Sequence, residues 1–159
     1  MSNTNNIVVK DVKNIKNPEV LADIIDYNFS YLKKEPLLMH NKNEIMRLLT
    51  SHDIICYLVY HNNKLVGYLV GEFKNVSDRY CFYISYVYVL DSYRRHKIGS
   101  YLMDKIIDYC KNNSIKFIVL SCDTYDKQVV DFYTKKYKFI KDPVLSTGGR
   151  HDVFCLFTY

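Results

Sequence analysis

Residues 83–104 read YISYVYVLDSYRRHKIGSYLMD, and three kinds of sequence meet in this stretch. In the first part Val87 and Val89 alternate with Tyr86 and Tyr88, a pattern typical of a β-strand that is buried on at least one face. Four residues that are basic or can become so follow, RRHK at positions 94–97. From Ile98 the apolar residues recur at helical spacing, with Gly99 in the first turn. The stretch therefore predicts a strand, a cationic loop and a helix N-terminus in immediate succession.

This succession favours a phosphate-binding site. The first N–H groups of a helix have no partner within the helix and carry partial positive charge, so an anion binds readily there. Gly99 lets the backbone approach a ligand closely, and Arg94 can grip a phosphate with two hydrogen bonds. A basic loop is more often plain solvated surface, but here it coincides with a glycine-containing helix start. A cofactor that carries a pyrophosphate explains the combination.

The flanking sequence extends the pattern to a mixed α/β (α+β) fold. Strands are expected at residues 7–12, 54–60, 65–73, 80–90, 116–122, 139–140 and 151–159, and helices at residues 18–34, 43–49, 98–110 and 126–136. The strand, helix and strand from residue 80 to 122 form a central β-α-β crossover, which requires parallel strands. We expect a single domain over residues 1–159, with a mixed, mostly antiparallel sheet of about seven strands and flanking helices.

The composition narrows the class of protein without choosing a partner. The 159 residues are 48% hydrophobic and 25% charged, as in one globular domain. The net charge of +5 suits an anionic partner of any kind. The five cysteines are scattered without a CxxC pair, so we expect free thiols and no metal site. No apolar run reaches the roughly 18 residues that span a bilayer, and we expect a cytoplasmic protein, with a nuclear location as an alternative.

Two segments resemble the GCN5-related N-acetyltransferase (GNAT) superfamily. YRRHKIGSYLMD, residues 93–104, resembles its acetyl-CoA-binding motif Gln/Arg-x-x-Gly-x-Gly/Ala, with Arg94 and Gly99 at the outer positions. DKQVVDFYTKKYKF, residues 126–139, resembles the segment in which an Asn precedes a helix with Phe-Tyr and Gly-Phe. FYISYV and YRRHKIG are most similar to eukaryotic N-terminal acetyltransferases, which have a histidine where this chain has Ser121.

The chain departs from the family's pattern at further positions. Lys97 replaces the first glycine of the motif, Asp126 the Asn, and Lys138 the Gly before Phe139. If the position of Lys97 requires a positive φ, a residue other than glycine costs on the order of 1 kcal/mol there.

The resemblance implies acetyl-CoA as the cofactor and gives roles to named residues. The pantetheine arm would lie along the main chain near Val87 and Val89, and the pyrophosphate at residues 94–99. The implied cofactor-binding residues are Val87, Tyr88, Val89, Arg94, Arg95, His96, Lys97, Ile98, Gly99, Ser100, Asp126 and Tyr133. Tyr133 would hydrogen-bond the leaving sulfur, and Tyr83 would act as a base through water. Glu72 is another candidate base, although an exposed glutamate at a strand end is the simpler interpretation.

The implied function is an acetyl-CoA-dependent N-acetyltransferase that acts on a primary amine. We expect a protein or peptide α-amine or a lysine as the acceptor, and the lack of a strong base favours the α-amine. The alternatives are a small-molecule amine acetyltransferase and a CoA-binding module without turnover. A nucleic-acid binder ranks last, because the tyrosines are spread through apolar strands and do not alternate with the charges. No motif identifies the acceptor or the oligomeric state; acceptor specificity is expected in the first two helices, the hairpin and the loop at residues 142–149.

Overall fold

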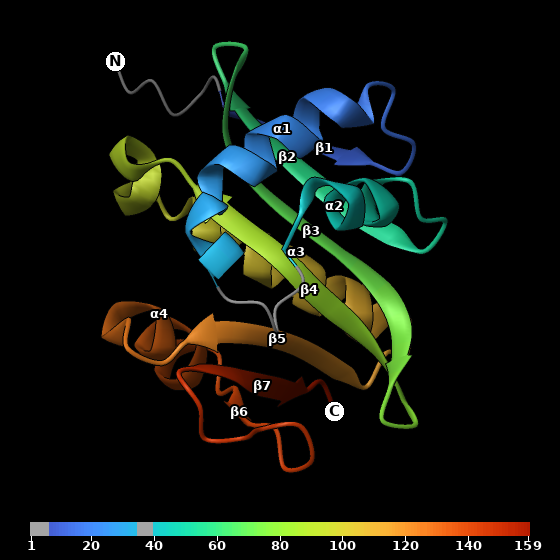
Figure 1. Cartoon of the computed structure of the whole chain (residues 1–159), viewed down its shortest axis with the longest axis vertical. Helices are drawn as coiled ribbons and strands as arrows, with labels where there is room; N and C mark the ends of the chain where they lie inside the picture. The colour runs from blue at the N-terminus through green and yellow to red at the C-terminus, as the bar shows by residue number, and fades with distance from the viewer. Residues whose placement is uncertain (1–6, 35–39) are drawn as a thin grey trace. The chain divides into compact units, whose positions relative to one another are not determined.

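The computed structural model describes residues 7–34 and 40–159 of the chain (Figure 1). Seven strands of these described residues form one sheet in the order β1-β2-β3-β4-β5-β7-β6. The strands are β1 (Ile7–Val12), β2 (Ile54–His61), β3 (Lys64–Val76), β4 (Arg79–Val89), β5 (Phe117–Asp123), β6 (Ile140–Lys141) and β7 (His151–Phe157). β4 and β5 pair in parallel, and helix α3 (Ile98–Asn112) connects them. The pairs β1–β2, β2–β3, β5–β7 and β6–β7 are antiparallel. The expected fold class, with its β-α-β crossover, is confirmed.

The chain divides into two compact units. The first unit comprises the described residues of 1–72 together with 86–99, and the second comprises 73–85 and 100–159. Each unit is described by itself below, and the single domain expected from the sequence stays a prediction. None of the helices in the described ranges is both long and apolar enough to span a bilayer.

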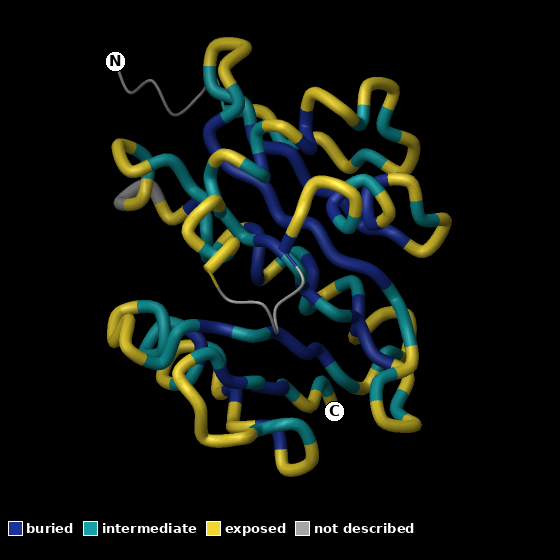
Figure 2. The backbone as a smooth tube through the Cα atoms, in the orientation of Figure 1, coloured by how far each residue is buried: buried dark blue, intermediate teal, exposed yellow. Residues whose placement is uncertain are grey.

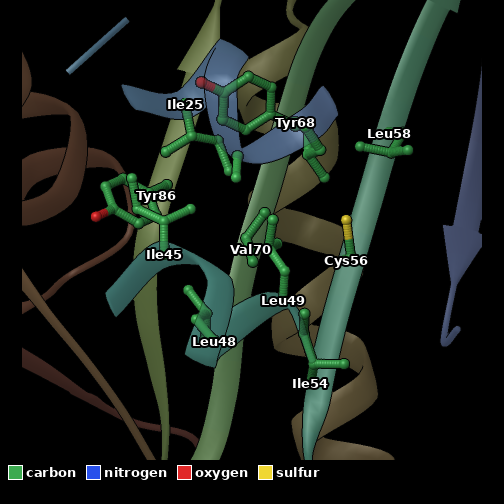
Figure 3. Close-up of a cluster of buried hydrophobic side chains, with 12 residues drawn as sticks. Ile25, Ile45, Leu48, Leu49, Ile54, Cys56, Leu58, Tyr68, Val70 and Tyr86 are labelled. Carbon is green, nitrogen blue, oxygen red and sulfur yellow. The ribbon is translucent and has the colours of Figure 1, made fainter. Parts of the chain in front are cut away.

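The core of the first unit lies between two helices and the strands β2 and β3 (Figure 3). Helix α1 (Pro18–Asn28) begins with a proline in its first turn, and α2 (Lys42–Leu49) begins where the Asn41 side chain accepts a hydrogen bond from the Glu44 N–H. Both helices turn an apolar stripe inward, and each aliphatic side chain buried in this way contributes about 1.5–3 kcal/mol. The buried cluster consists of Leu21, Ala22, Ile25, Ile45, Leu48, Leu49, Ile54, Cys56, Leu58, Tyr68, Val70 and Tyr86.

In the second unit β5 is the buried strand. Its residues Ile118, Val119 and Leu120 pair with Phe82, Tyr83 and Ile84 of β4 on one side and with β7 on the other. Helix α3 buries the apolar stripe that the sequence predicted, with Leu102, Met103, Ile106 and Cys110 inaccessible to solvent. All five cysteines of the chain are buried free thiols, as expected. Figure 2 shows the buried backbone concentrated in the strands and the exposed backbone in the turns.

Three boundaries differ from the sequence-based expectation. Helix α1 ends at Asn28, and a 3₁₀ turn, η2 (Ser30–Lys34), follows, because Asn and Ser compete with the helical backbone for hydrogen bonds. The helix expected at residues 126–136 divides into α4 (Lys127–Asp131) and a π-helical turn, η5 (Phe132–Lys136). Within it the Thr134 hydroxyl donates to the Val130 carbonyl, a bond that competes with regular helical pairing. Strand β3 continues past residue 73 to Val76.

Candidate functional site

The segment after β4 is fixed to the neighbouring strands of its unit. The Leu90 N–H donates to the Val66 carbonyl of β3 at 2.9 Å, and the Tyr93 hydroxyl is hydrogen-bonded to Nδ1 of His61 at the end of β2. The 3₁₀ turn η4 (Asp91–His96) runs from there to Lys97. These contacts fix the point at which the chain leaves the sheet and enters α3.

The start of α3 leaves its main-chain donors open. Lys97 has φ 61° and ψ 22°, so the sequence-based condition of a positive φ at this position is met. Ile98 is buried and anchors the helix, and Gly99 and Ser100 follow in the first turn. Among the described residues, no side chain is hydrogen-bonded to the main-chain N–H groups of Ile98, Gly99 or Ser100. A helix N-terminus of this kind fits the pyrophosphate of a CoA-type cofactor.

The cationic residues of η4 are only partly described. The Arg94 side chain is 63% exposed, and its guanidinium contacts Asp91 at 3.0 Å. Its Nε also donates to the Val89 carbonyl at 3.2 Å, so one of the two main-chain groups expected to hold pantetheine has a local partner here. The side chains of Arg95 and His96 lie outside the described part. Because Arg94 is exposed, it can exchange these local bonds for a phosphate at little cost.

A glycine that sequence reasoning missed brings β3 close to this segment. A Cβ added at Gly67 would lie 3.1 Å from the Tyr88 carbonyl oxygen and 3.2 Å from Cγ2 of Ile98. Most Cβ contacts are longer, so only glycine lets the backbones approach this closely without a shift. Tyr88 in turn stacks on Tyr68 with ring centroids 5.6 Å apart. Val87, Tyr88 and Val89 are half-buried, which leaves part of each accessible to a ligand.

In the second unit, the first turn of α3 contacts the end of η5. The Lys136 ammonium donates to the Ser100 hydroxyl at 2.6 Å, and the Tyr137 hydroxyl lies 3.0 Å from the Ser100 carbonyl and 2.9 Å from an Asp104 carboxylate oxygen. Burial, together with Asp104, raises the pKa of Tyr137 to about 12, so its hydroxyl stays a donor. Lys136 adds a positive charge beside Ser100, in the first turn of α3. The sequence suggested this lysine only for nucleic-acid binding.

Asp126 and Tyr133 both lie in the segment at residues 126–139 that resembles the family pattern, but they have different surroundings. Asp126 is exposed, and its carboxylate accepts from the Val129 N–H at 3.3 Å as the N-cap of α4. Tyr133 is 9% exposed, with its ring between those of Phe132 and Phe139. Within the described residues the Tyr133 hydroxyl has no hydrogen-bond partner. Burial, and to a lesser extent Cys122, raises the pKa of Tyr133, which keeps the phenol protonated.

The structure brings Tyr83 and Ser121 together. Their hydroxyl oxygens are 3.1 Å apart across the parallel pair β4–β5, in which Tyr83 is in register with Val119. The Lys74 ammonium lies 4.4 Å from the centre of the Tyr83 ring. The two hydroxyl groups can hold a water molecule, as the sequence-based role for Tyr83 requires. That role stays a prediction.

Glu72 is not the exposed strand-end residue that the simpler interpretation expected. It is 5% exposed, because β3 continues beyond it, and it is in register with Ile54 of β2. Both of its carboxylate oxygens accept from the Arg47 guanidinium of α2, at 2.8 and 3.2 Å. The bonds to Glu72 and Glu44 raise the pKa of Arg47. Glu72 stays a candidate base, but the ion pair must open before its carboxylate can take a proton.

The loop expected to carry acceptor specificity, residues 142–149, is organised by two buried carboxylates. Asp142 accepts from the N–H groups of Val144 and Leu145 at 2.9 and 3.0 Å, and from Arg79 at 2.6 Å. Asp152 accepts from a hydroxyl and three main-chain N–H groups at 2.7 to 3.0 Å, namely those of Ser146, Thr147, Gly148 and Val153. Any specificity of this loop therefore rests on a fixed backbone.

Known proteins share both the sequence pattern and the fold. The profile described as the acetyltransferase (GNAT) family matches residues 19–139. NAA60 of Arabidopsis thaliana in complex with acetyl-CoA has a TM-score of 0.66 at 15% identity, covering 95% of this chain and 98% of its own. PaiA N-acetyltransferase of Thermoplasma acidophilum in complex with coenzyme A scores 0.65 at 18% identity, with 99% of each chain covered.

The fold also occurs in proteins named for a different acceptor. The aminoglycoside acetyltransferase meta-AAC0020, from an uncultured soil metagenomic sample, has a TM-score of 0.67 at 16% identity, covering 92% of this chain and 97% of its own. No curated protein sequence gives a significant match. At these identities the likeness to solved structures concerns the fold, and it leaves the acceptor open.

Proposed function

This chain belongs to the acetyltransferase (GNAT) family, and we propose that it transfers an acetyl group from acetyl-CoA to the nitrogen of a primary amine. The observation that carries this proposal is the N-terminus of α3, where left-handed Lys97 leads into main-chain donors that have no side-chain acceptor in the part of the chain that the structure describes. Acetyl-CoA, when bound, supplies the acetyl group as a thioester. The first turn of α3 and Arg94 would hold its phosphates, and Val87 and Val89 its pantetheine arm.

Tyr133 is the residue best suited to assist the leaving group. Its hydroxyl has no partner in the described part of the chain, and its raised pKa keeps the proton on oxygen. A phenol near pKa 10 already gives its proton uphill to a thiolate near 8.5, and burial makes full transfer harder still. Tyr133 therefore acts as a hydrogen-bond donor to the developing negative charge and does not transfer its proton completely.

The acceptor we favour is a protein or peptide α-amine, with lysine as the second choice. At neutral pH a lysine is free amine about once per thousand molecules, a deficit of roughly 4 kcal/mol, whereas an α-amine loses under about 1.5 kcal/mol. Tyr83 is hydrogen-bonded to Ser121, but N-terminal acetyltransferases have a histidine at the position of Ser121, so the likeness to them is incomplete. A small-molecule amine is the alternative, in line with the aminoglycoside acetyltransferase of the same fold.

A labelled acetyl-CoA assay against three parallel panels tests the function. The panels are peptides with free N-termini, N-blocked peptides that contain lysine, and small amines that include polyamines and aminoglycosides. We expect transfer to the free N-termini. Transfer only to small amines would make the alternative acceptor class the right one. Tight CoA binding without transfer to any panel would instead support a cofactor-binding module, for which the departures at Lys97, Asp126 and Ser121 are the argument.

Tyr133→Phe separates catalysis from binding in the same assay. Removing one donor to a developing charge lowers turnover by roughly 10- to 1000-fold. The CoA dissociation constant measured by calorimetry should be largely unchanged, because the ring packing of Tyr133 is kept. Unchanged turnover would remove Tyr133 from the mechanism.

A further inference from the structure

A buried histidine that the roles above do not use lies against β4. His40 Nδ1 is 2.8 Å from the Tyr86 hydroxyl, and the two rings meet edge to face with centroids 5.7 Å apart. The His40 side chain is only 1% exposed, whereas Tyr86 as a residue is 9% exposed. Tyr86 is therefore the more accessible member of the pair.

The other nitrogen of the same imidazole faces a carboxylate. His40 Nε2 is 3.8 Å from Asp26 Oδ1 of α1, and both atoms are buried without a hydrogen bond within the described residues. The Lys33 ammonium of η2 contacts the same carboxylate at 3.2 Å. Burial lowers the pKa of His40, Asp26 raises it and Lys33 lowers it, so the imidazole is neutral at pH 7. A carboxylate placed this close favours any proton that the imidazole gains.

The position of Tyr86 connects this chain of groups to the proposed transfer site. Tyr86 directly precedes Val87 on β4, where we place the pantetheine arm. Figure 3 shows the Tyr86 hydroxyl at the end of the ring that points away from the buried aliphatic side chains. Polar groups within an apolar cluster cost free energy unless they are paired, and perturbed titratable groups of this kind concentrate at functional sites.

We infer that Tyr86 and His40, backed by Asp26, form the proton relay that converts the acceptor's ammonium group to the free amine; this rests on the proposed function. With the imidazole proton on Nε2, the Tyr86 hydroxyl donates to Nδ1 of His40. The ammonium gives a proton to the Tyr86 oxygen while the tyrosine's own proton moves to His40, and the resulting imidazolium faces Asp26. Tyr86 is the catalytic residue, and His40 and Asp26 act through it.

The rest of the transfer balances without another reactant. The freed amine forms a bond from nitrogen to the acetyl carbon, the carbon–sulfur bond breaks, and sulfur leaves with the electron pair. The second proton shed by the nitrogen neutralises the thiolate, and His40 returns its proton to solvent through Tyr86.

This relay also bears on the class of acceptor. An α-ammonium ordinarily titrates about one pH unit above a histidine, whereas a lysine titrates about four units above it. A histidine whose pKa is lowered by burial is therefore a workable base for an α-amine and a poor one for lysine. The relay therefore predicts that the enzyme prefers free N-termini to lysine side chains as acceptors.

The decisive experiment measures kcat/KM against pH for a free N-terminal peptide with wild type, His40→Gln and Tyr86→Phe. Gln still accepts a hydrogen bond from Tyr86 but cannot take up a proton, and Phe keeps the ring packing. At pH 7 we expect each variant to lose about 5- to 10-fold, because an α-amine is only partly deprotonated at that pH. The loss should disappear as the pH passes the pKa of the α-amine, because free amine needs no base. His52→Gln, an exposed histidine, is the matched control and should follow wild type.

Each outcome has a defined meaning. A loss that stays constant across pH would overturn the relay and show that His40 only holds the backbone in place, and full activity of either variant would overturn it as well. Thermal melts and CoA titrations identify a variant that fails to fold, in which case the other variant carries the test. Absence of transfer by wild type would instead refute the proposed function.

Discussion

Main-chain N–H donors have different partners in two segments of the molecule. One segment lies between β4 and α3, and the other is the loop between β6 and β7. At the start of α3, the N–H groups of Ile98, Gly99 and Ser100 have no side-chain acceptor among the described residues. In the loop between β6 and β7, four N–H groups are bonded to the buried carboxylates of Asp142 and Asp152, namely those of Val144, Leu145, Thr147 and Gly148. We propose that the first segment binds an external anion, whereas in the second segment the protein's own carboxylates occupy the donors.

This difference separates a binding loop from a structural one. Both segments follow a strand, but the first carries the basic run RRHK, whereas the second is bonded to the protein's own buried carboxylates, those of Asp142 and Asp152. A carboxylate that accepts from the loop's own N–H groups stabilises the loop in the folded protein. N–H groups without such an acceptor at a helix start can instead bind an external phosphate.

Removing the internal carboxylate should have the largest effect. Asp152→Asn replaces an acceptor oxygen with an amide group that faces other donors, and it should lower the free energy of unfolding by roughly 2–4 kcal/mol. Urea denaturation measures the loss, and Asp53→Asn, an exposed aspartate, is the control. CoA affinity of the folded variant should be unchanged. A loss below about 1 kcal/mol would show that the carboxylate does not hold the loop.

The same carboxylate predicts a dependence on pH. Burial alone would raise the pKa of Asp152, but the hydrogen bonds from Ser146, Thr147, Val153 and Gly148 outweigh it and hold the pKa at about 2. An unfolded aspartate titrates near 3.9. The stabilisation is therefore complete above about pH 4 and is lost as the pH falls towards 2. Over this window the unfolding free energy of Asp152→Asn should fall less steeply than that of wild type.

Placing a carboxylate of the protein at the N-terminus of α3 should have the next largest effect. Ser100→Asp places a carboxylate in the first turn of α3, where it is favoured by the helix dipole by about 0.3–1 kcal/mol and by Lys136. It should weaken CoA binding about tenfold, or roughly 1.4 kcal/mol, by repelling the phosphates. Calorimetry measures the affinity and a thermal melt the stability. Ser100→Asn is the neutral control, and an equal loss of affinity in both variants would assign the effect to shape and not to charge.

The sequence was most informative where its signals are local. The strand, loop and helix of residues 83–104, and the positive φ at Lys97, follow from periodicity and from a motif position, and the structure confirms them. Lys138, which also replaces a glycine of the pattern, has φ 65° as well. These features depend on residues adjacent in the chain, and physical rules for a single segment are enough to predict them.

Pairings between distant residues were not predicted. Glu72 and Arg47 are 25 residues apart in sequence, Lys136 and Ser100 are 36 apart, and His40 and Tyr86 are 46 apart. No local sequence pattern identifies either residue of such a pair, because a single histidine or glutamate has the same sequence context whether its side chain is solvated or paired. Gly67 was missed for the same reason, since its close neighbours Tyr88 and Ile98 come from other elements.

The smallest effect we predict concerns the left-handed residue at the open site. Lys97→Gly removes a backbone strain of about 1–2 kcal/mol and adds chain entropy of about 0.5–1 kcal/mol to the unfolded state, so a net stabilisation of about 0.5–1 kcal/mol follows. Urea denaturation should show this gain, with Lys97→Asn, which tolerates the same conformation, between the two. CoA affinity should fall only a few-fold for either variant, because one exposed charge is lost while the main-chain donors stay. If Lys97→Gly instead lowers the free energy of unfolding, the lysine side chain stabilises the fold by more than its left-handed backbone strain costs. The site would then depend on charge more than on the geometry of the helix start.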